Sequence, residues 1–156
     1  MSLVLLVDDQ PDLLDLYTEI LDRMGHQVLG AHDGWEALAR AHERRPDLVI
    51  TDFWMTPGMD GVELSHQLHL DPILRDVPII LQSAAEDPHT SDVQAFLSKS
   101  CDLAEFETLV TRVLASARAH RQAQSRREDR TSSRSSSRTH SHASLGRSTS
   151  SSHIGF

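Results

Sequence analysis

The stretch Leu3-Val4-Leu5-Leu6-Val7-Asp8-Asp9 decides the fold class of this chain. Its first five residues form an unbroken apolar run, which is typical of a strand that is buried on both faces. The next segment, residues 11–24, carries apolar side chains at helical spacing, with Pro11 in its first turn and Gly25 after its end. A buried strand followed directly by a helix predicts the first βα unit of a parallel sheet.

The same alternation of strand and helix patterns continues as far as residue 117. We expect further strands at residues 27–31, 48–51, 77–81 and 95–97, and further helices at residues 34–44, 60–70 and 103–117. Residues 86–92 include Pro88 and few apolar positions, so we expect only a loop or a single turn there. The pattern predicts an α/β fold whose five parallel strands are covered by helices on both faces. In such sheets, ligands bind beyond the carboxyl ends of the strands.

Polar residues collect at those strand ends: Asp8 and Asp9 after the first expected strand, Asp52 after the third, Ser83 after the fourth and Lys99 after the fifth. Grouped carboxylates raise one another's pKa unless a cation joins them. Mg²⁺ is such a cation, because it takes carboxylate, carbonyl and water oxygens. A carboxylate in this setting can act as a nucleophile toward phosphorus, while an ammonium and a hydroxyl hold the phosphoryl oxygens. The set therefore favours phosphoryl transfer to an aspartate.

Each of these residues also has a simpler interpretation. Asp8 and Asp9 precede Pro11 and would suit a helix cap, and Asp52 alone would suit a turn. Lys99 alone would suit an exposed position, but it is the only lysine in a chain with fourteen arginines, which favours a need for a compact ammonium. Because the acidic residues and the lysine follow three different strands, we prefer the phosphoryl-transfer interpretation.

These motifs resemble the receiver domains of two-component response regulators, including the small chemotaxis regulators, over residues 3–117. The matching pieces are residues 3–9, Asp52 with residues 55–61, Ser83-Ala84, and residues 96–99. The resemblance implies a doubly wound, flavodoxin-like sheet of strand order 2-1-3-4-5, here with a shortened or missing fourth helix. It also implies a signalling phosphoprotein rather than an enzyme, with Mg²⁺ as cofactor. Such a protein takes its phosphoryl group from a sensor histidine kinase or a phosphotransfer protein and acts on a downstream protein target.

The resemblance assigns roles by position. On the metal side it implies that Asp52 is the phosphoacceptor, Asp9 a direct Mg²⁺ ligand, Asp8 a ligand through water, and Trp54 a ligand through its backbone carbonyl. On the other side it implies that Ser83 is the switch hydroxyl, Lys99 the phosphate-binding ammonium, and Phe96 the aromatic that swings between outward and inward positions. Plain core packing explains Phe96 equally well.

Four features depart from the usual receiver pattern. Thr56 makes the loop after the phosphoacceptor one residue longer, and Ser100 follows Lys99 where receivers usually have a proline in a cis peptide. The connection between the fourth and fifth strands is too short for a full helix. Trp54 and Ala85 occupy the two variable positions that flank the site, and neither side chain can hold an attacking water.

The formal charge of −8 divides unevenly along the chain. Residues 118–156 carry eight arginines against Glu128 and Asp129, whereas residues 1–117 are strongly acidic. An acidic body does not suit a nucleic-acid backbone, so we expect no direct DNA binding. The Ser-, Arg- and His-rich composition of residues 118–156 predicts a disordered tail behind a receiver domain at residues 1–117.

Several classes of protein are disfavoured by what the sequence lacks. It has no apolar run of membrane-spanning length and no signal-peptide pattern, so we expect a cytoplasmic protein without membrane contact. Its single cysteine, Cys101, excludes an internal disulfide. Two functions stay open: a phosphorylation switch or relay, and an unswitched interaction module that keeps the acidic pocket without efficient chemistry.

Overall fold

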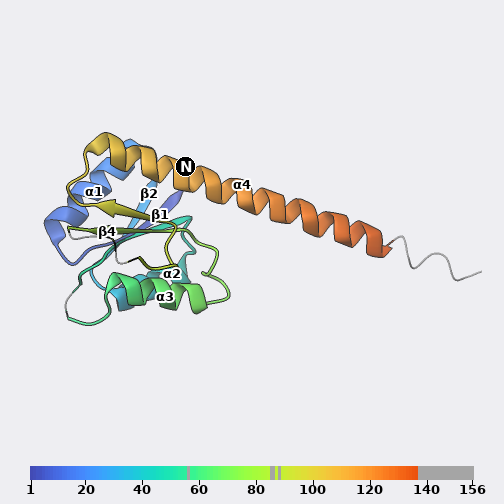
Figure 1. Ribbon diagram of the computed structural model, residues 1–156, viewed down its shortest axis with the longest axis horizontal. Coiled ribbons are helices and arrows are strands. Elements are labelled where there is room, and N and C mark those ends of the chain that lie inside the picture. Colours follow the sequence, from blue (N-terminus) through green and yellow to red (C-terminus); the bar gives the residue numbers. More distant parts are fainter. Residues whose placement is uncertain (56, 85–86, 88, 137–156) are drawn as a thin grey trace, which may run out of the picture. The chain divides into compact units, whose positions relative to one another are not determined.

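The computed structural model describes residues 1–55, 57–84, 87 and 89–136 (Figure 1). The elements in order are β1 (Leu3–Val7), α1 (Pro11–Arg23), β2 (Gln27–Ala31), α2 (Gly34–Glu43), β3 (Leu48–Asp52), α3 (Gly61–Leu70), β4 (Ile79–Ser83), β5 (Ala95–Ser98) and α4 (Leu103–Ser136). All strand pairs are parallel, and the order across the sheet is β2-β1-β3-β4-β5. The predicted α/β fold and its strand order are confirmed.

Successive strand residues point to opposite faces of the sheet, and each face has its own apolar core. On one face, α1 and the first turns of α4 pack against a cluster that includes Val4, Leu6 and Ile50. On the other face, α2 and α3 pack against a cluster that includes Leu5 and Val49. Figure 1 shows this arrangement, with α1 and α4 on one side of the sheet and α2 and α3 on the other. Because both faces are covered, the strands read as the continuous apolar runs seen in the sequence.

The segment between β4 and β5 contains no helix in its described residues, as expected from its length. Gln94 holds its end to β4: the Gln94 backbone amide donates to the Ile79 carbonyl at 2.9 Å, and its side-chain Oε1 accepts from the Ile79 amide at 2.6 Å. Val93 packs against the core beside α3, and Asp92 meets His66 of α3 at 3.3 Å. The described residues of this segment therefore form turns and coil where receivers usually carry a helix. Ala85, Glu86 and Pro88 lie outside the described residues.

The last helix is longer than predicted. We expected it to end at Ala117, but α4 continues to Ser136. No Gly or Pro interrupts residues 103–136, and the Ala, Arg, Gln and Glu residues after position 117 are good helix formers, so local propensity outweighs the polar composition. Contacts divide the chain into two units at Arg118 and Ala119. The predicted disorder of residues 137–156 lies outside the described residues. Within the described residues, no helix has both the length and the apolar character needed to cross a bilayer.

Candidate phosphoacceptor site

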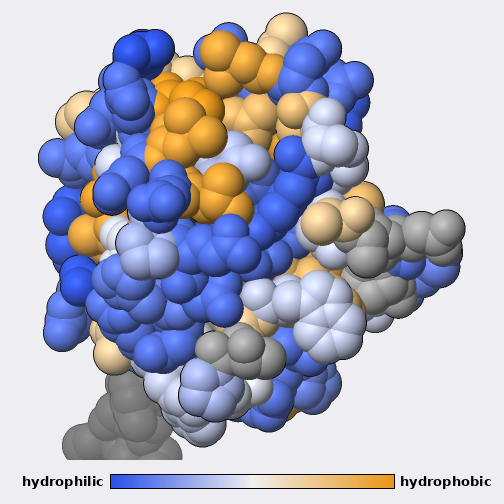
Figure 2. Space-filling model, turned by 90° about the vertical axis from the view of Figure 1, so that its left-hand side faces the viewer, coloured by the Kyte–Doolittle hydropathy of each residue, from blue (hydrophilic) through white to orange (hydrophobic). Residues whose placement is uncertain are grey.

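Four strands bring the candidate residues to one edge of the sheet. Asp8 and Asp9 follow β1, Asp52 ends β3, Ser83 ends β4 and Lys99 follows β5. Figure 2 shows this face, on which hydrophilic residues cover much of the surface and an apolar patch lies above them. The sequence therefore identified the correct edge of the sheet.

Lys99 joins two of the carboxylates. Its Nζ lies 3.1 Å from Oδ2 of Asp52 and 3.2 Å from Oδ2 of Asp8. The ligand oxygens of Asp8, Asp9 and Asp52 all lie within 4.8 Å of one another. Asp8 is 1% exposed and Asp52 5% exposed, so two of these three carboxylates are buried. The lone lysine thus lies inside the acidic cluster, which excludes its interpretation as a chance surface residue.

Burial and neighbouring charges shift the pKa values of this pair. Desolvation, the largest cause, raises the pKa of Asp52; the hydrogen bond and charge of Lys99 lower it, the charges of Asp8 and Asp9 raise it, and the net shift is upward. For Lys99, desolvation lowers the pKa, but the Asp52 and Asp8 carboxylates raise it further, and the net shift is upward. The asymmetry has a simple cause: Lys99 has two carboxylates beside it, whereas Asp52 shares one ammonium with Asp8. Among the described residues, the buried carboxylates of Asp8 and Asp52 therefore share the ammonium of Lys99.

The oxygens of this cluster suit Mg²⁺ in kind and spacing. Mg²⁺ prefers hard oxygen ligands and is usually bound by one or two carboxylates together with waters. Asp9 and Asp52 are the residues that would hold it directly, and the other candidate ligand is the backbone carbonyl of Trp54. Asp8 is already engaged, because its Oδ1 accepts from the Gln10 amide at 2.9 Å and its Oδ2 meets Lys99.

The helix-cap interpretation of Asp8 and Asp9 is wrong. The N-cap of α1 is Gln10, and among the described residues no side chain makes a capping hydrogen bond there. Asp8 instead bonds to the amide that precedes the helix and to the ammonium of Lys99. Its carboxylate therefore belongs to the acidic cluster and not to the helix terminus.

The loop after Asp52 is held against the strand by α3. The Phe53 amide donates to the Gln82 carbonyl at 2.8 Å, and the Gly61 amide donates to the Phe53 carbonyl at 2.9 Å. A Cβ at Gly61 would overlap the backbone carbonyl oxygen of Asp52, so only glycine lets α3 begin this close to the strand. Trp54 is 61% exposed and meets Phe53 edge-on, with ring centroids 4.6 Å apart. Thr56, the extra residue of this loop, lies outside the described residues.

Ser83 and Lys99 are bound through their backbones. The Lys99 amide donates to the Ser83 carbonyl at 2.9 Å, next to the register pair Ser83 and Ser98. Ser83 is fully buried. Where receivers usually have a proline, Ser100 closes the turn: its amide donates to Oγ of Ser98 at 3.2 Å, and the two hydroxyls lie 2.7 Å apart. Hydroxyl hydrogen bonds thus stabilise the turn that carries Lys99.

Phe96 lies half-buried on the edge strand β5. It lines an open pocket of about 450 Å³ together with Leu97 and residues at the start of α4, among them Glu105 and Thr108. Its predicted role as a mobile aromatic stays a prediction.

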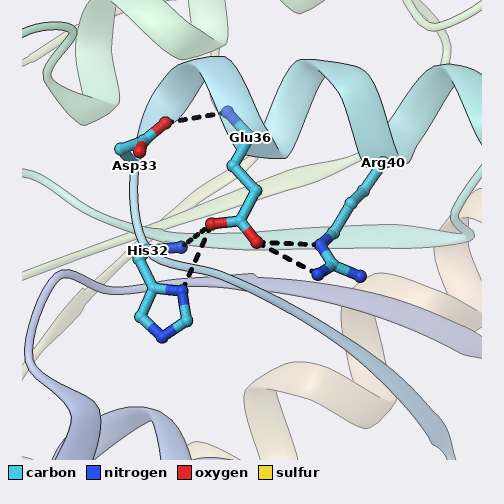
Figure 3. A network of polar contacts seen from close by, with 4 residues as sticks. All are labelled: His32, Asp33, Glu36 and Arg40. Atoms are coloured by element: carbon cyan, nitrogen blue, oxygen red, sulfur yellow. Dashed lines mark hydrogen bonds and ion pairs between the residues drawn. The ribbon is translucent and has the colours of Figure 1, made fainter.

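A polar network at the same edge was not identified from the sequence. Asp33 caps α2 by accepting from the Glu36 amide at 2.8 Å, and the Glu36 carboxylate accepts from the His32 amide at 2.9 Å (Figure 3). Arg40 donates to the same carboxylate at 3.0 Å. The spacing of an Asp and a Glu three residues apart is a capping-box signal that indicates this helix start. The network anchors α2 directly after β2.

Comparison with known protein families gives a match that covers most of the sheet and its helices. The model of the response regulator receiver domain matches residues 4–111. PilH of Pseudomonas aeruginosa is 36% identical over 93 residues, which are 60% of this chain and 75% of PilH. The phosphate regulon transcriptional regulatory protein PhoB of the same organism is 36% identical over 81 residues, but the match covers only 35% of PhoB.

Solved structures agree with these sequence matches. Chemotaxis protein CheY4 of Vibrio cholerae aligns with a TM-score of 0.67 and 28% identity, covering 72% of this chain and 98% of that one. The response regulator TrrA of Thermotoga maritima, solved in complex with Mg²⁺ and BeF, aligns with a TM-score of 0.67 and 30% identity over 72% of this chain and 99% of that one.

Proposed function

Because this chain belongs to the response regulator receiver domain family, we propose that it is a phosphorylation-dependent switch or relay of two-component signalling. In this proposal, Asp52 accepts a phosphoryl group from a histidine kinase or a phosphotransfer protein. The observation that carries it is the position of Lys99, which lies within 3.2 Å of both Asp8 and Asp52 in a cluster of three carboxylates.

The transfer is a substitution at phosphorus. A carboxylate oxygen of Asp52 forms the new P–O bond while the P–N bond of the donor phosphohistidine breaks, and the electron pair of that bond returns to the imidazole nitrogen. When bound, Mg²⁺ supplies positive charge to the oxygens of the transferring group. The ammonium of Lys99, 3.1 Å from Oδ2 of Asp52, offsets charge on a phosphoryl oxygen. The Ser83 hydroxyl is the group that we assign to the switch, and Phe96 the aromatic that follows it.

The rest of the proposal concerns partners and location. We propose that the receiver comprises residues 1–117 and that residues 118–156 are an appendage rather than a second folded domain, because the described side chains after Arg118 are exposed or half-exposed. PhoB is a transcriptional regulatory protein, but the match to this chain covers only 35% of it. We therefore propose a protein target in the cytoplasm, and neither DNA nor a membrane as a direct partner.

Acetyl phosphate with Mg²⁺ tests the proposal directly, with intact mass as the readout. We expect the protein to gain one phosphoryl group, and EDTA or Asp52→Asn to abolish the gain. Asp76→Asn is the matched control, because Asp76 is an exposed aspartate away from the cluster. Equal phosphorylation of Asp52→Asn would overturn the assignment of the acceptor.

A second candidate function rests on the described departures from the family pattern. The turn after Lys99 has Ser100 in place of proline, and the described residues between β4 and β5 form no helix. Both features suit an unswitched module that binds partners without efficient phosphoryl chemistry. A protein that stays unmodified by acetyl phosphate and by a phosphorylated phosphotransfer domain would favour this function.

A further inference from the structure

One buried polar side chain lies directly behind the phosphoacceptor site. Gln82 is 1% exposed in β4, next to Ser83 in sequence and paired with Asp52 across the sheet. The three preceding residues of the strand are apolar and buried. Because side chains alternate along a strand, Gln82 points to the same face as Ile80, which is the face covered by α1 and α4.

The carboxamide of Gln82 is not satisfied. Among the residues that the structure describes, none accepts a hydrogen bond from its Nε2 at proper geometry. A buried donor without an acceptor is unfavourable, because it has given up its hydrogen bonds to water. Such a group favours any conformational state in which it gains an acceptor. The end of β4 beside Asp52 is therefore expected to favour a conformation in which the Gln82 carboxamide gains an acceptor.

The phenol of Tyr17 on α1 belongs to the buried cluster on the same face of the sheet, together with Ile80 and with Leu97, the register partner of Gln82 on β5. Burial, followed by the charge of Cys101, raises the pKa of Tyr17, whereas the Gln82 side chain acts on the phenol as a donor and lowers the pKa. The carboxamide thus acts on the phenol, while its Nε2 has no hydrogen-bond partner among the described residues. The charges of Lys99 and Asp8 also act on the pKa of the phenol, the first lowering it and the second raising it.

The other end of Tyr17 reaches α4. Tyr17 is 8% exposed, and its ring packs against that of Phe106, with centroids 5.1 Å apart and planes inclined by 31°. Phe106 is itself 2% exposed in the first turn of α4. Tyr17 therefore joins α1 to the start of α4, on the face of the sheet to which Gln82 points.

We propose that Gln82 and Tyr17 form a positioning pair that transmits the occupancy of Asp52 to α1 and α4, with the Gln82 carboxamide closing onto the Tyr17 hydroxyl when Asp52 is phosphorylated. This inference rests on the proposed function. Ser83 and Gln82 are adjacent on β4, so a movement of Ser83 toward the phosphoryl group moves Gln82 as well. The new hydrogen bond gives Nε2 of Gln82 an acceptor. It also reorients the Tyr17 ring, which packs against Phe106.

The chain offers a specific probe, because Tyr17 is its only tyrosine. Protein labelled with 3-fluorotyrosine gives a single ¹⁹F resonance, which is recorded before and after addition of Mg²⁺ and beryllofluoride. Gln82→Met keeps the length of the side chain and removes its donor. Gln67→Met is the matched control, since Gln67 is an exposed residue of α3 on the other face of the sheet. Phosphorylation by acetyl phosphate is measured in parallel by intact mass.

Three results are distinguishable. We expect phosphorylation in all three proteins, a shift of the Tyr17 resonance on loading in the wild type and in Gln67→Met, and loss of that shift in Gln82→Met. A merely structural role of Gln82 would leave the shift intact, so an equal shift in Gln82→Met, or none in the wild type, overturns this inference while the proposed function stands. If neither acetyl phosphate nor beryllofluoride modifies the wild type, the proposed function and this inference both fail.

Discussion

Lys99 Nζ lies 3.1 Å from Oδ2 of Asp52, which joins the residue after β5 to the last residue of β3. The same ammonium lies 3.2 Å from Asp8 and so serves two buried carboxylates at once. Buried ions are stable only when their partners compensate the loss of water. In the part of the chain that the structure describes, these two carboxylates share one ammonium, and a divalent ion would add positive charge beside them.

The raised pKa of Asp52 predicts that this residue destabilises the metal-free protein at neutral pH. A carboxyl whose pKa is higher in the folded state contributes its stability below the unfolded pKa and loses it as the pH rises through the folded pKa. Asp52→Asn should therefore raise the free energy of unfolding at pH 7, because the amide carries no charge to be buried. The gain should vanish as the pH falls toward the ordinary value of 3.8.

Urea denaturation in EDTA between pH 4 and pH 8 measures this effect. Glu36→Gln is a control of opposite sign: the hydrogen bond from the His32 backbone, more than any other contact, lowers the pKa of Glu36. Its contribution is present above the unfolded pKa and is lost as the pH falls through the folded pKa. Glu36→Gln should thus destabilise slightly at pH 7. An Asp52→Asn protein that is less stable than the wild type at pH 7 would contradict the prediction.

Gly61→Ala should disrupt the site through packing alone. The added Cβ would overlap the carbonyl oxygen of Asp52 and would lie 2.8 Å from Cδ1 of Leu81. We expect a loss of about 3 kcal/mol of stability, at the upper end of overpacking effects, because backbone atoms cannot move aside as a flexible side chain does. Gly30→Ala is the matched control, since its Cβ would meet only the Leu14 side chain, at 3.4 Å. Equal thermal midpoints for the two variants would refute the argument.

The strand-end rule is the reason that so much of the site could be predicted from sequence. Continuous apolar runs mark strands covered on both faces, and the residue after each run is then placed at one edge of the sheet. Asp8, Asp52 and Lys99 were identified in this way, and their mutual distances agree. Which carboxylates pair with Lys99 was not predictable, because this depends on how far its flexible side chain reaches.

Other features depended on information that local patterns do not carry. The end of α4 was placed too early because polar composition was weighted above helix propensity. Gln82 was overlooked because a single polar residue next to an apolar run is typical of a strand end. In the structure it lies inside β4, paired with Asp52, and is buried. Its relation to Tyr17 joins two segments that no sequence pattern connects.

Trp54 should slow hydrolysis of the phosphorylated site. It is the second residue after Asp52, and its ring packs edge-on against Phe53 at a centroid distance of 4.6 Å. An indole at this position cannot hold an attacking water, whereas an asparagine amide can hydrogen-bond one. We expect Trp54→Asn to raise the decay rate of the phosphorylated protein several-fold, measured by intact mass over time. Trp35→Asn is the control, because Trp35 is comparably exposed on α2. An unchanged decay rate in Trp54→Asn would contradict this prediction.

The short connection between β4 and β5 predicts that phosphorylation does not produce the dimer that many receivers form. That dimer uses the helix between these strands, and the described residues here form none. Gln94 is held to β4, and Asp92 meets His66 of α3. Light scattering coupled to size exclusion should give a mass near 17.4 kDa both before and after addition of Mg²⁺ and beryllofluoride. Asp52→Asn, which should not take up beryllofluoride, controls for effects of the reagent. A mass that doubles in the wild type and not in Asp52→Asn would show that another surface has replaced the missing helix, and the prediction would be wrong.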